Sequence, residues 1–180
     1  MSSPAASTTS VRKALRRFHR NRRGSAAVEF ALVAPVFFAL LFAIIETAII
    51  FFASQVLETI TQTSGRYVMT GQAQAAALTA GQFKTYVCNQ IPALFTCANL
   101  YVDVQSYSSF TSVTFNSHID ATNNFDTTMQ YSPGTQGQIV VVRLFYQWPL
   151  FVTGLGYNIS NLTGSKRLLA ATAAFQNEPF

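Results

Sequence analysis

The feature that most constrains this chain is an apolar run of 24 residues, Phe30 to Ala53, broken by only three other residues. At about 1.5 Å per residue, a helix of this length measures roughly 36 Å and can cross the hydrocarbon core of a bilayer with some tilt. A secretory signal peptide has a shorter apolar core, about 7 to 15 residues, followed by a small-residue cleavage site. This run is longer and ends in IIFFASQV, without such a site. We therefore predict a transmembrane segment over residues 30–53.

Charge is distributed unevenly along the sequence. From Ser25 onward, five basic residues face seven acidic ones, so the formal net charge of +5 comes from the N-terminal leader. A cluster of Lys and Arg beside a membrane segment stays in the cytoplasm, so we expect the leader inside and the body outside. The cluster could also bind nucleic acid through phosphate contacts, but its place before the apolar run favours the topological role, and we expect no nucleic-acid partner. Its members are Arg12, Lys13, Arg16, Arg17, Arg20, Arg22 and Arg23.

The helix is predicted to continue beyond the apolar run. Apolar residues recur there with a spacing of three and four, and Ser64 fills the gap on the same face. Gly71 then offers a helix stop. We expect one helix of some 45 residues within segment 25–71, whose second half carries an apolar stripe that another part of the chain must cover. The stripe consists of Val56, Leu57, Ile60, Tyr67 and Val68.

Residues 72–180 are predicted to form a small α+β domain. The polar stretch 116–137 has no periodicity, and a loop of this length is either disordered or a contact surface. The segment Arg167–Phe175 is ambiguous between helix and strand. Apolar spacing predicts a second amphipathic helix over residues 76–91, ended by Pro92, and alternation or continuous apolar character predicts strands over 100–107, 110–115 and 138–148.

The stretch RNRRGSAAVEF, Arg20 to Phe30, is where a resemblance to a known family begins. A basic leader ending in glycine, a glutamate five residues later and a helix half in lipid and half under a small head resemble the type IV pilin-like proteins. The glycine–x4–glutamate–aromatic form, here Gly24, Glu29 and Phe30, resembles the Flp/Tad branch and, within it, the TadE-like pseudopilins. The later stretches GRYVMTGQAQ, LYVDVQSY and ATAAFQNEPF are similar too.

The resemblance implies how the chain is processed and where it acts. A membrane-embedded prepilin peptidase would remove residues 1–24 by cutting between Gly24 and Ser25, and Glu29 and Phe30 would serve assembly with other pilin and pseudopilin subunits. The chain would be a single-pass protein of the bacterial inner membrane with a periplasmic head. Main filament subunits are much shorter, so this chain is more similar to a minor or priming subunit.

The resemblance also implies a pilin-like fold. A long N-terminal helix would pack on a small antiparallel sheet of three or four strands, with Arg167–Phe175 as one of them. This sheet would cover the apolar stripe of the helix, because a helix with one apolar face must bury it against another layer.

Cys88 and Cys97 are the only cysteines, and both lie outside the membrane by the topology argument. An oxidising compartment favours a disulfide, worth roughly 2 to 4 kcal/mol. The alternative, a metal site, needs four ligands or three plus water, and the body adds only His118 to the two thiols. We expect the disulfide, no metal and no cofactor, with His118 as a solvated loop residue.

No pattern in the sequence predicts a catalytic residue: there is no nucleophile elbow, no phosphate-binding glycine loop and no histidine pair at helical spacing. Asp103, Asp120 and Asp126 could form an acid–base set, but two of them fall in a loop that the sequence predicts to be solvated. We expect a substrate of an enzyme rather than an enzyme. A periplasmic enzyme on a membrane tether has the least support in the sequence.

Two questions remain open at this stage. Glu46 is an ionisable residue in the apolar run, which indicates a functional polar contact in the membrane, with a partner subunit supplying its pair. Equally, its carboxylate could reach the outer interface or stay protonated. The whole chain could be an assembling pseudopilin, or an anchored periplasmic binding or adhesion module that never assembles.

Overall fold

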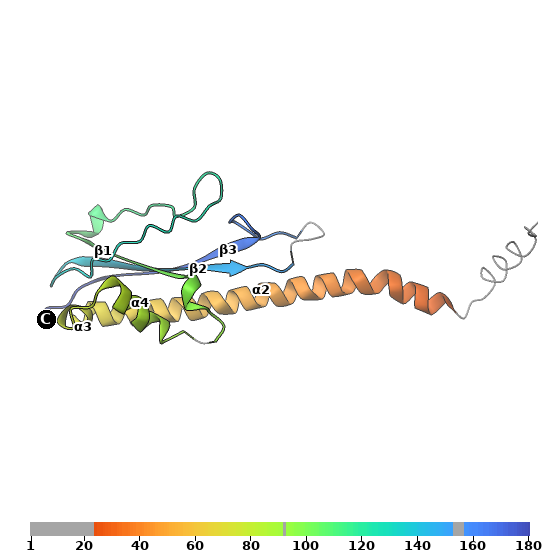
Figure 1. Cartoon of the computed structure of the whole chain (residues 1–180), viewed down its shortest axis with the longest axis horizontal. Coiled ribbons are helices and arrows are strands. Elements are labelled where there is room, and N and C mark those ends of the chain that lie inside the picture. Colours follow the sequence, from red (N-terminus) through yellow and green to blue (C-terminus); the bar gives the residue numbers. More distant parts are fainter. Residues whose placement is uncertain (1–23, 92, 153–156) are drawn as a thin grey trace, which may run out of the picture. The chain divides into compact units, whose positions relative to one another are not determined.

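A computed structural model describes residues 24–91, 93–152 and 157–180, so the seven basic residues of the leader and Pro92 lie outside the described residues. The chain divides into two compact units, Met1–Phe42 and Ala43–Phe180. The long helix α2, Ser25–Met69, contributes to both units (Figure 1).

Helix α2 confirms the predicted long helix, at 45 residues. Of the helices that the structure describes, it is the one long and apolar enough to cross a membrane, with a mean hydropathy of 2.6 over its most apolar window. The helix ends before Gly71, whose φ of 75° is left-handed, a conformation that glycine adopts without strain. Every large apolar side chain of α2 in the first unit is exposed, from Val28 to Phe42.

The second unit contains a three-stranded antiparallel sheet in the order β1-β2-β3 (Figure 1). Its strands are β1 (Leu100–Tyr107), β2 (Ile139–Pro149) and β3 (Lys166–Gln176). The first and second agree with the sequence prediction, and the third confirms the strand assignment that the resemblance implied. The central strand β2 is buried along nearly its whole length, which explains its continuous apolar sequence.

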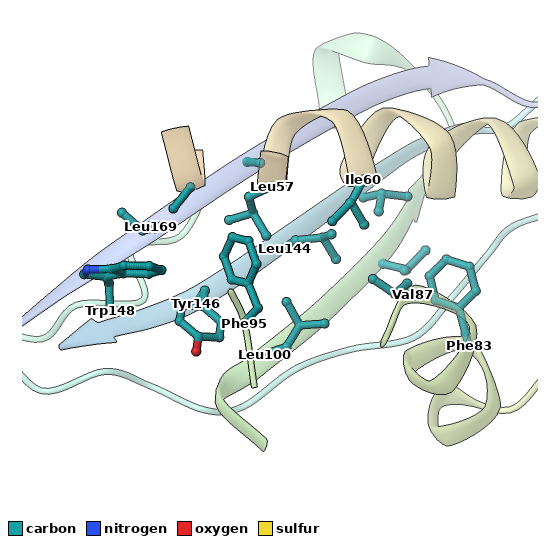
Figure 2. Packing of buried hydrophobic residues seen from close by; sticks show 14 of the residues in the cluster. Leu57, Ile60, Phe83, Val87, Phe95, Leu100, Leu144, Tyr146, Trp148 and Leu169 are labelled. Carbon is teal, nitrogen blue, oxygen red and sulfur yellow. The ribbon is translucent and has the colours of Figure 1, made fainter. Parts of the chain in front are cut away.

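The apolar stripe on the second half of α2 is covered by this sheet, as expected. Leu57 and Ile60 point into a cluster with Leu144 and Leu169 of the sheet, and Phe95 fills the space beneath (Figure 2). Leu57 is only 1% exposed. Truncating a buried leucine to alanine costs about 2 to 5 kcal/mol, so Leu57 contributes substantially to the stability of the second unit.

The predicted second helix, residues 76–91, is wrong in its extent. Within this range the helix is α4 (Ala80–Cys88), and a separate single turn, α3 (Gln72–Ala75), precedes it. They are separated because Ala77 takes a positive φ of 48°, which a continuing helix cannot contain. Thr79 then starts α4 with a capping box that it forms with Gln82, a local signal at the helix start.

The predicted disulfide is present. Cys88 at the end of α4 is bonded to Cys97, with their Cα atoms 5.7 Å apart. Cys97 opens a short 3-10 helix, η2 (Cys97–Asn99), that leads directly into β1. The bond therefore fixes the connection between the helical layer and the sheet.

The strand predicted over residues 110–115 is wrong. The chain forms a single 3-10 turn there, η3 (Phe110–Ser112), and no strand follows it before β2 in the described residues. Ser109 and Ser112 hydrogen-bond to each other's backbone and side chains. Such local bonds compete with strand pairing, and the period-two pattern did not account for them.

The polar stretch 116–137 follows the sheet instead of extending away from it. The Val104 amide donates to the carbonyl of Gln130 at 2.9 Å, and Ser132 donates back to Val104 at 2.8 Å, so this segment covers the outer edge of β1. His118 is only 9% exposed and packs against Phe145 with ring centroids 4.6 Å apart. The expectation of a solvated His118 was wrong, because its ring packs against Phe145 of the sheet.

A buried ion pair fastens this covering segment to the sheet. Asp103 of β1 is opposite Arg143 of β2, and its carboxylate accepts hydrogen bonds from the Arg143 Nε at 3.1 Å and Nη2 at 2.8 Å. It also accepts from the backbone amide of Gln130 at 2.8 Å. Both charged side chains are nearly inaccessible to solvent.

Replacing Asp103 with asparagine should destabilise the second unit by about 3 to 5 kcal/mol, because it leaves the Arg143 charge buried without a counter-ion. The lone tryptophan of the chain, Trp148, is buried and reports unfolding by fluorescence during urea titration of the full chain in detergent. Adding Arg143→Met should recover part of the loss. Asp126→Asn, at an exposed loop position, is the control and should change little, and an equal loss there would contradict the assignment.

Candidate functional site

Three features of α2 bear on function: the junction at its start, Glu29 near that start, and Glu46 farther along. Gly24 directly precedes the first helical residue, Ser25. A Cβ built on Gly24 meets nothing within 4 Å among the described residues, and its φ is not in the left-handed region. Neither steric crowding nor backbone strain among the described residues requires a glycine at position 24.

Glu29 is the fifth residue of α2 and is exposed, as is its neighbour Phe30 at 69%. The carboxylate lies one turn into α2, past the first turn in which the helix dipole acts most strongly. The ion pair recorded among the described residues, between Arg143 and Asp103, does not involve it. Glu29 thus presents its charge on a helix face surrounded by exposed apolar side chains.

Glu46 is different, because its carboxylate is bound within its own chain. It is 7% exposed and accepts a hydrogen bond from the Phe151 amide at 2.5 Å and one from the Val152 amide at 3.1 Å. The next residue, Thr47, is hydrogen-bonded to the hydroxyl of Tyr157. These contacts hold the connection between β2 and β3 against α2. We call the Glu46, Phe151 and Val152 contact the helix–loop clasp.

The sequence could not have revealed the helix–loop clasp. It showed an ionisable residue in an apolar run and left its partner open. The partners are two backbone amides more than a hundred positions away, and every residue except proline carries such a group. Only the folded loop identifies them.

The three aspartates considered as an acid–base set do not come together. Asp103 belongs to the buried ion pair, and Asp120 and Asp126 cap turns in the covering loop. A hydrogen bond from the Asn124 amide, and another from the Thr122 side chain, lower the pKa of Asp120. A hydrogen bond from the Thr128 amide does the same for the pKa of Asp126. A general acid at neutral pH requires the opposite shift.

The C-terminal motif NEPF has a structural task. Asn177 is buried and its amide nitrogen donates to the carbonyls of Pro133 and Thr135 at 3.0 and 3.1 Å. The Glu178 amide donates to the carbonyl of Met69 at 2.9 Å. The ring of Phe180 lies over Gly71, where a Cβ would come within 2.3 Å of it. The motif therefore joins the end of α2 to the covering loop.

Metal binding finds no support in the part of the chain that the structure describes, where His, Cys, Asp and Glu form no group of three or more suited to hold an ion. The two cysteines are already joined in the disulfide.

The comparisons with known proteins point to the same segment. Residues 24–66 match the family model described as TadE-like protein. No curated protein and no solved structure matches the chain. The family match begins at Gly24 and ends near the end of α2, so it contains the junction, Glu29 and Glu46. Residues 24–66 are therefore similar to TadE-like proteins, whereas the comparisons give no relative for the sheet domain.

Loss of the Glu46 carboxylate should free the loop that the helix–loop clasp holds. In Glu46→Ala, the amides of Phe151 and Val152 lose a charged acceptor, and a hydrogen bond to a charged group contributes about 1.5 to 3 kcal/mol, so their hydrogen exchange should accelerate roughly 10- to 100-fold. Exchange measured by NMR on the full chain in micelles tests this. Glu58→Ala, on the same helix, should leave both amides protected, and unchanged exchange in Glu46→Ala would show that the clasp does not order the loop.

Proposed function

We propose that this chain, TadE-like over residues 24–66, is a membrane-anchored pseudopilin, or minor pilin, that a prepilin peptidase processes after Gly24 and that takes part in assembly of a Tad/Flp-type pilus. The observation that carries the proposal is the start of the family match at Gly24, at the head of an exposed apolar helix that bears Glu29. TadE-like proteins are pilus components and not a family of enzymes, which agrees with a structural role.

Processing would change the charge balance at the start of α2. Cleavage between Gly24 and Ser25 creates an α-amino group, whose ordinary pKa of about 7.7 to 8.0 leaves it mostly protonated at neutral pH. An unpaired carboxylate in lipid costs about 2.5 to 3.5 kcal/mol on insertion scales. An ion pair between the new amine of one subunit and Glu29 of its neighbour would offset the free energy that each unpaired charge costs in lipid. We propose that this pair sets the axial register between subunits.

The exposed side chains of the first unit support a helix-packing role. Lipid tails solvate apolar side chains as well as a neighbouring helix does, so apolar contact alone provides little driving force for association in a bilayer. A specific charged pair would then determine how such helices align with one another. Phe30, beside Glu29 and 69% exposed, would pack at the same contact.

The proposed topology places the leader in the cytoplasm and the sheet domain in the periplasm. Seven basic residues before Gly24 favour a cytoplasmic leader. The Cys88–Cys97 disulfide on the other side of the apolar segment supports an oxidising compartment for the sheet domain. We propose the bacterial inner membrane as the site of anchoring.

The proposal predicts that Gly24→Ala blocks removal of the leader. The chain would then accumulate as the longer precursor in membranes of cells that carry the peptidase, visible by its mobility on an immunoblot. Gly81→Ala is the matched control, because a Cβ at Gly81 also meets nothing within 4 Å, and it should be processed normally. A fully processed Gly24→Ala chain would contradict the cleavage site.

A second prediction separates assembly from processing. Glu29→Ala should still be cut, but it should be absent from pili sheared from the cell surface, because the proposed partner of the Ser25 amine is gone. Immunoblots of the sheared and membrane fractions test this, with Glu58→Ala as the control carboxylate. Normal amounts of the Glu29→Ala chain in pili would overturn the role of Glu29. A non-assembling anchored binding module would be absent from sheared pili with or without the substitution.

A further inference from the structure

The helix–loop clasp fixes where the sheet domain begins to cover α2. Residues 26–45 are all exposed or half-buried, and Glu46 is the first buried residue of the helix. Twenty residues of helix measure about 30 Å, which equals the thickness of a hydrocarbon core. A span over 30–53 would instead take Ile50 and Ala53, both buried against the sheet domain, into the bilayer together with part of that domain. The lipid boundary therefore fits best at Glu46.

Phe151 lies at this level of the helix. Its backbone amide is 2.5 Å from the Glu46 carboxylate, while its side chain is 83% exposed, more than any other large apolar side chain that the structure describes. Leu150, directly before it, is buried and donates its amide to the Ser165 carbonyl at 2.9 Å. The backbone is thus fastened on both sides of a large side chain that contacts little within its own chain.

The surroundings of Phe151 have the composition of a membrane interface. On α2, close to Glu46 in sequence, Ile45, Ile49 and Phe52 are 44%, 41% and 62% exposed. The sequence from 147 to 165 contains no charged residue. Tyr157 follows Phe151 along the chain and is hydrogen-bonded to Thr47 of α2, and tyrosine is a residue type that gathers at membrane–water interfaces.

Basic side chains lie at the same end of the sheet. Lys166 pairs in register with Pro149 at the end of β2, and Arg167 pairs with Trp148. Cations near the headgroup region are attracted by anionic lipid. An aromatic tip next to a pair of basic residues therefore fits a lipid surface better than an aqueous one.

We infer that Phe151, directly after β2 and positioned by Glu46, is a second membrane contact whose side chain inserts into the boundary between lipid headgroups and acyl chains. The inference rests on the membrane anchoring in the proposed function and not on processing or assembly. Insertion is favoured because it removes the exposed apolar surface of the phenylalanine side chain from water. This contact would fix the height at which the domain sits and limit its rotation about α2.

The test places an environment-sensitive NBD label at single cysteines in the full chain, reconstituted into vesicles of phosphatidylethanolamine and phosphatidylglycerol. The native cysteines do not react because they form the disulfide. The labelled variants are Phe151→Cys, Phe115→Cys as an exposed loop control at 64%, and Phe37→Cys as a helix control at 57%. Trp148 fluorescence verifies that each variant is folded.

Lipids with a doxyl quencher near the headgroup should quench the label at 151 severalfold more than the label at 115, and aqueous iodide should give the reverse order. Lipids with the doxyl group deep in the acyl chains should quench the label at 37. If the label at 151 responds to iodide as the label at 115 does, or is shielded from both quenchers, the inference fails. If lipid still quenches the label at 37 in that case, residues of α2 are in the membrane and only the inference about Phe151 fails. If doxyl lipids quench neither 37 nor 151, the anchor itself is wrong, and the proposed function falls with the inference.

Discussion

The structure depends on one continuous helix that must satisfy two different environments. In the first unit α2 exposes every large apolar side chain, and in the second it buries a stripe under the sheet. The change occurs at Glu46, whose carboxylate is bound by the amides of Phe151 and Val152. A charged group at this position is tolerated because two backbone donors replace the water it has lost.

Other contacts of the sheet domain hold the sheet against the second half of α2. The central strand β2 supplies most of the buried face, the Asp103–Arg143 pair fastens the covering loop, and the C-terminal NEPF closes over the end of α2. The large exposed apolar side chains of the first unit lie on α2, within the residues that the family model matches.

The sequence predicted the elements whose signals are local and periodic, and it missed those that depend on tertiary contacts. The long helix and the strand at β2 follow from uninterrupted patterns, and β3 needed the resemblance because its pattern fits a helix equally well. The strand expected at 110–115 failed because serine side chains compete with pairing there. His118 was predicted to be solvated because its partner, Phe145, lies on the distant strand β2. The role of Asp103 was missed for the same reason, since its partner Arg143 is also on β2. Within the candidate site, Gly24 and Glu29 could be picked out by spacing, whereas the partners of Glu46 could not.

Everything proposed for Gly24, Ser25 and Glu29 requires that the leader be removed. The most direct measurement is N-terminal sequencing of the wild-type chain purified from membranes of cells that carry the peptidase. The account predicts Ser25 as the first residue, with its amine free or modified only after cleavage. A chain that still begins at Met1 or Ser2 would contradict it, and would leave the basic leader as a topology signal alone.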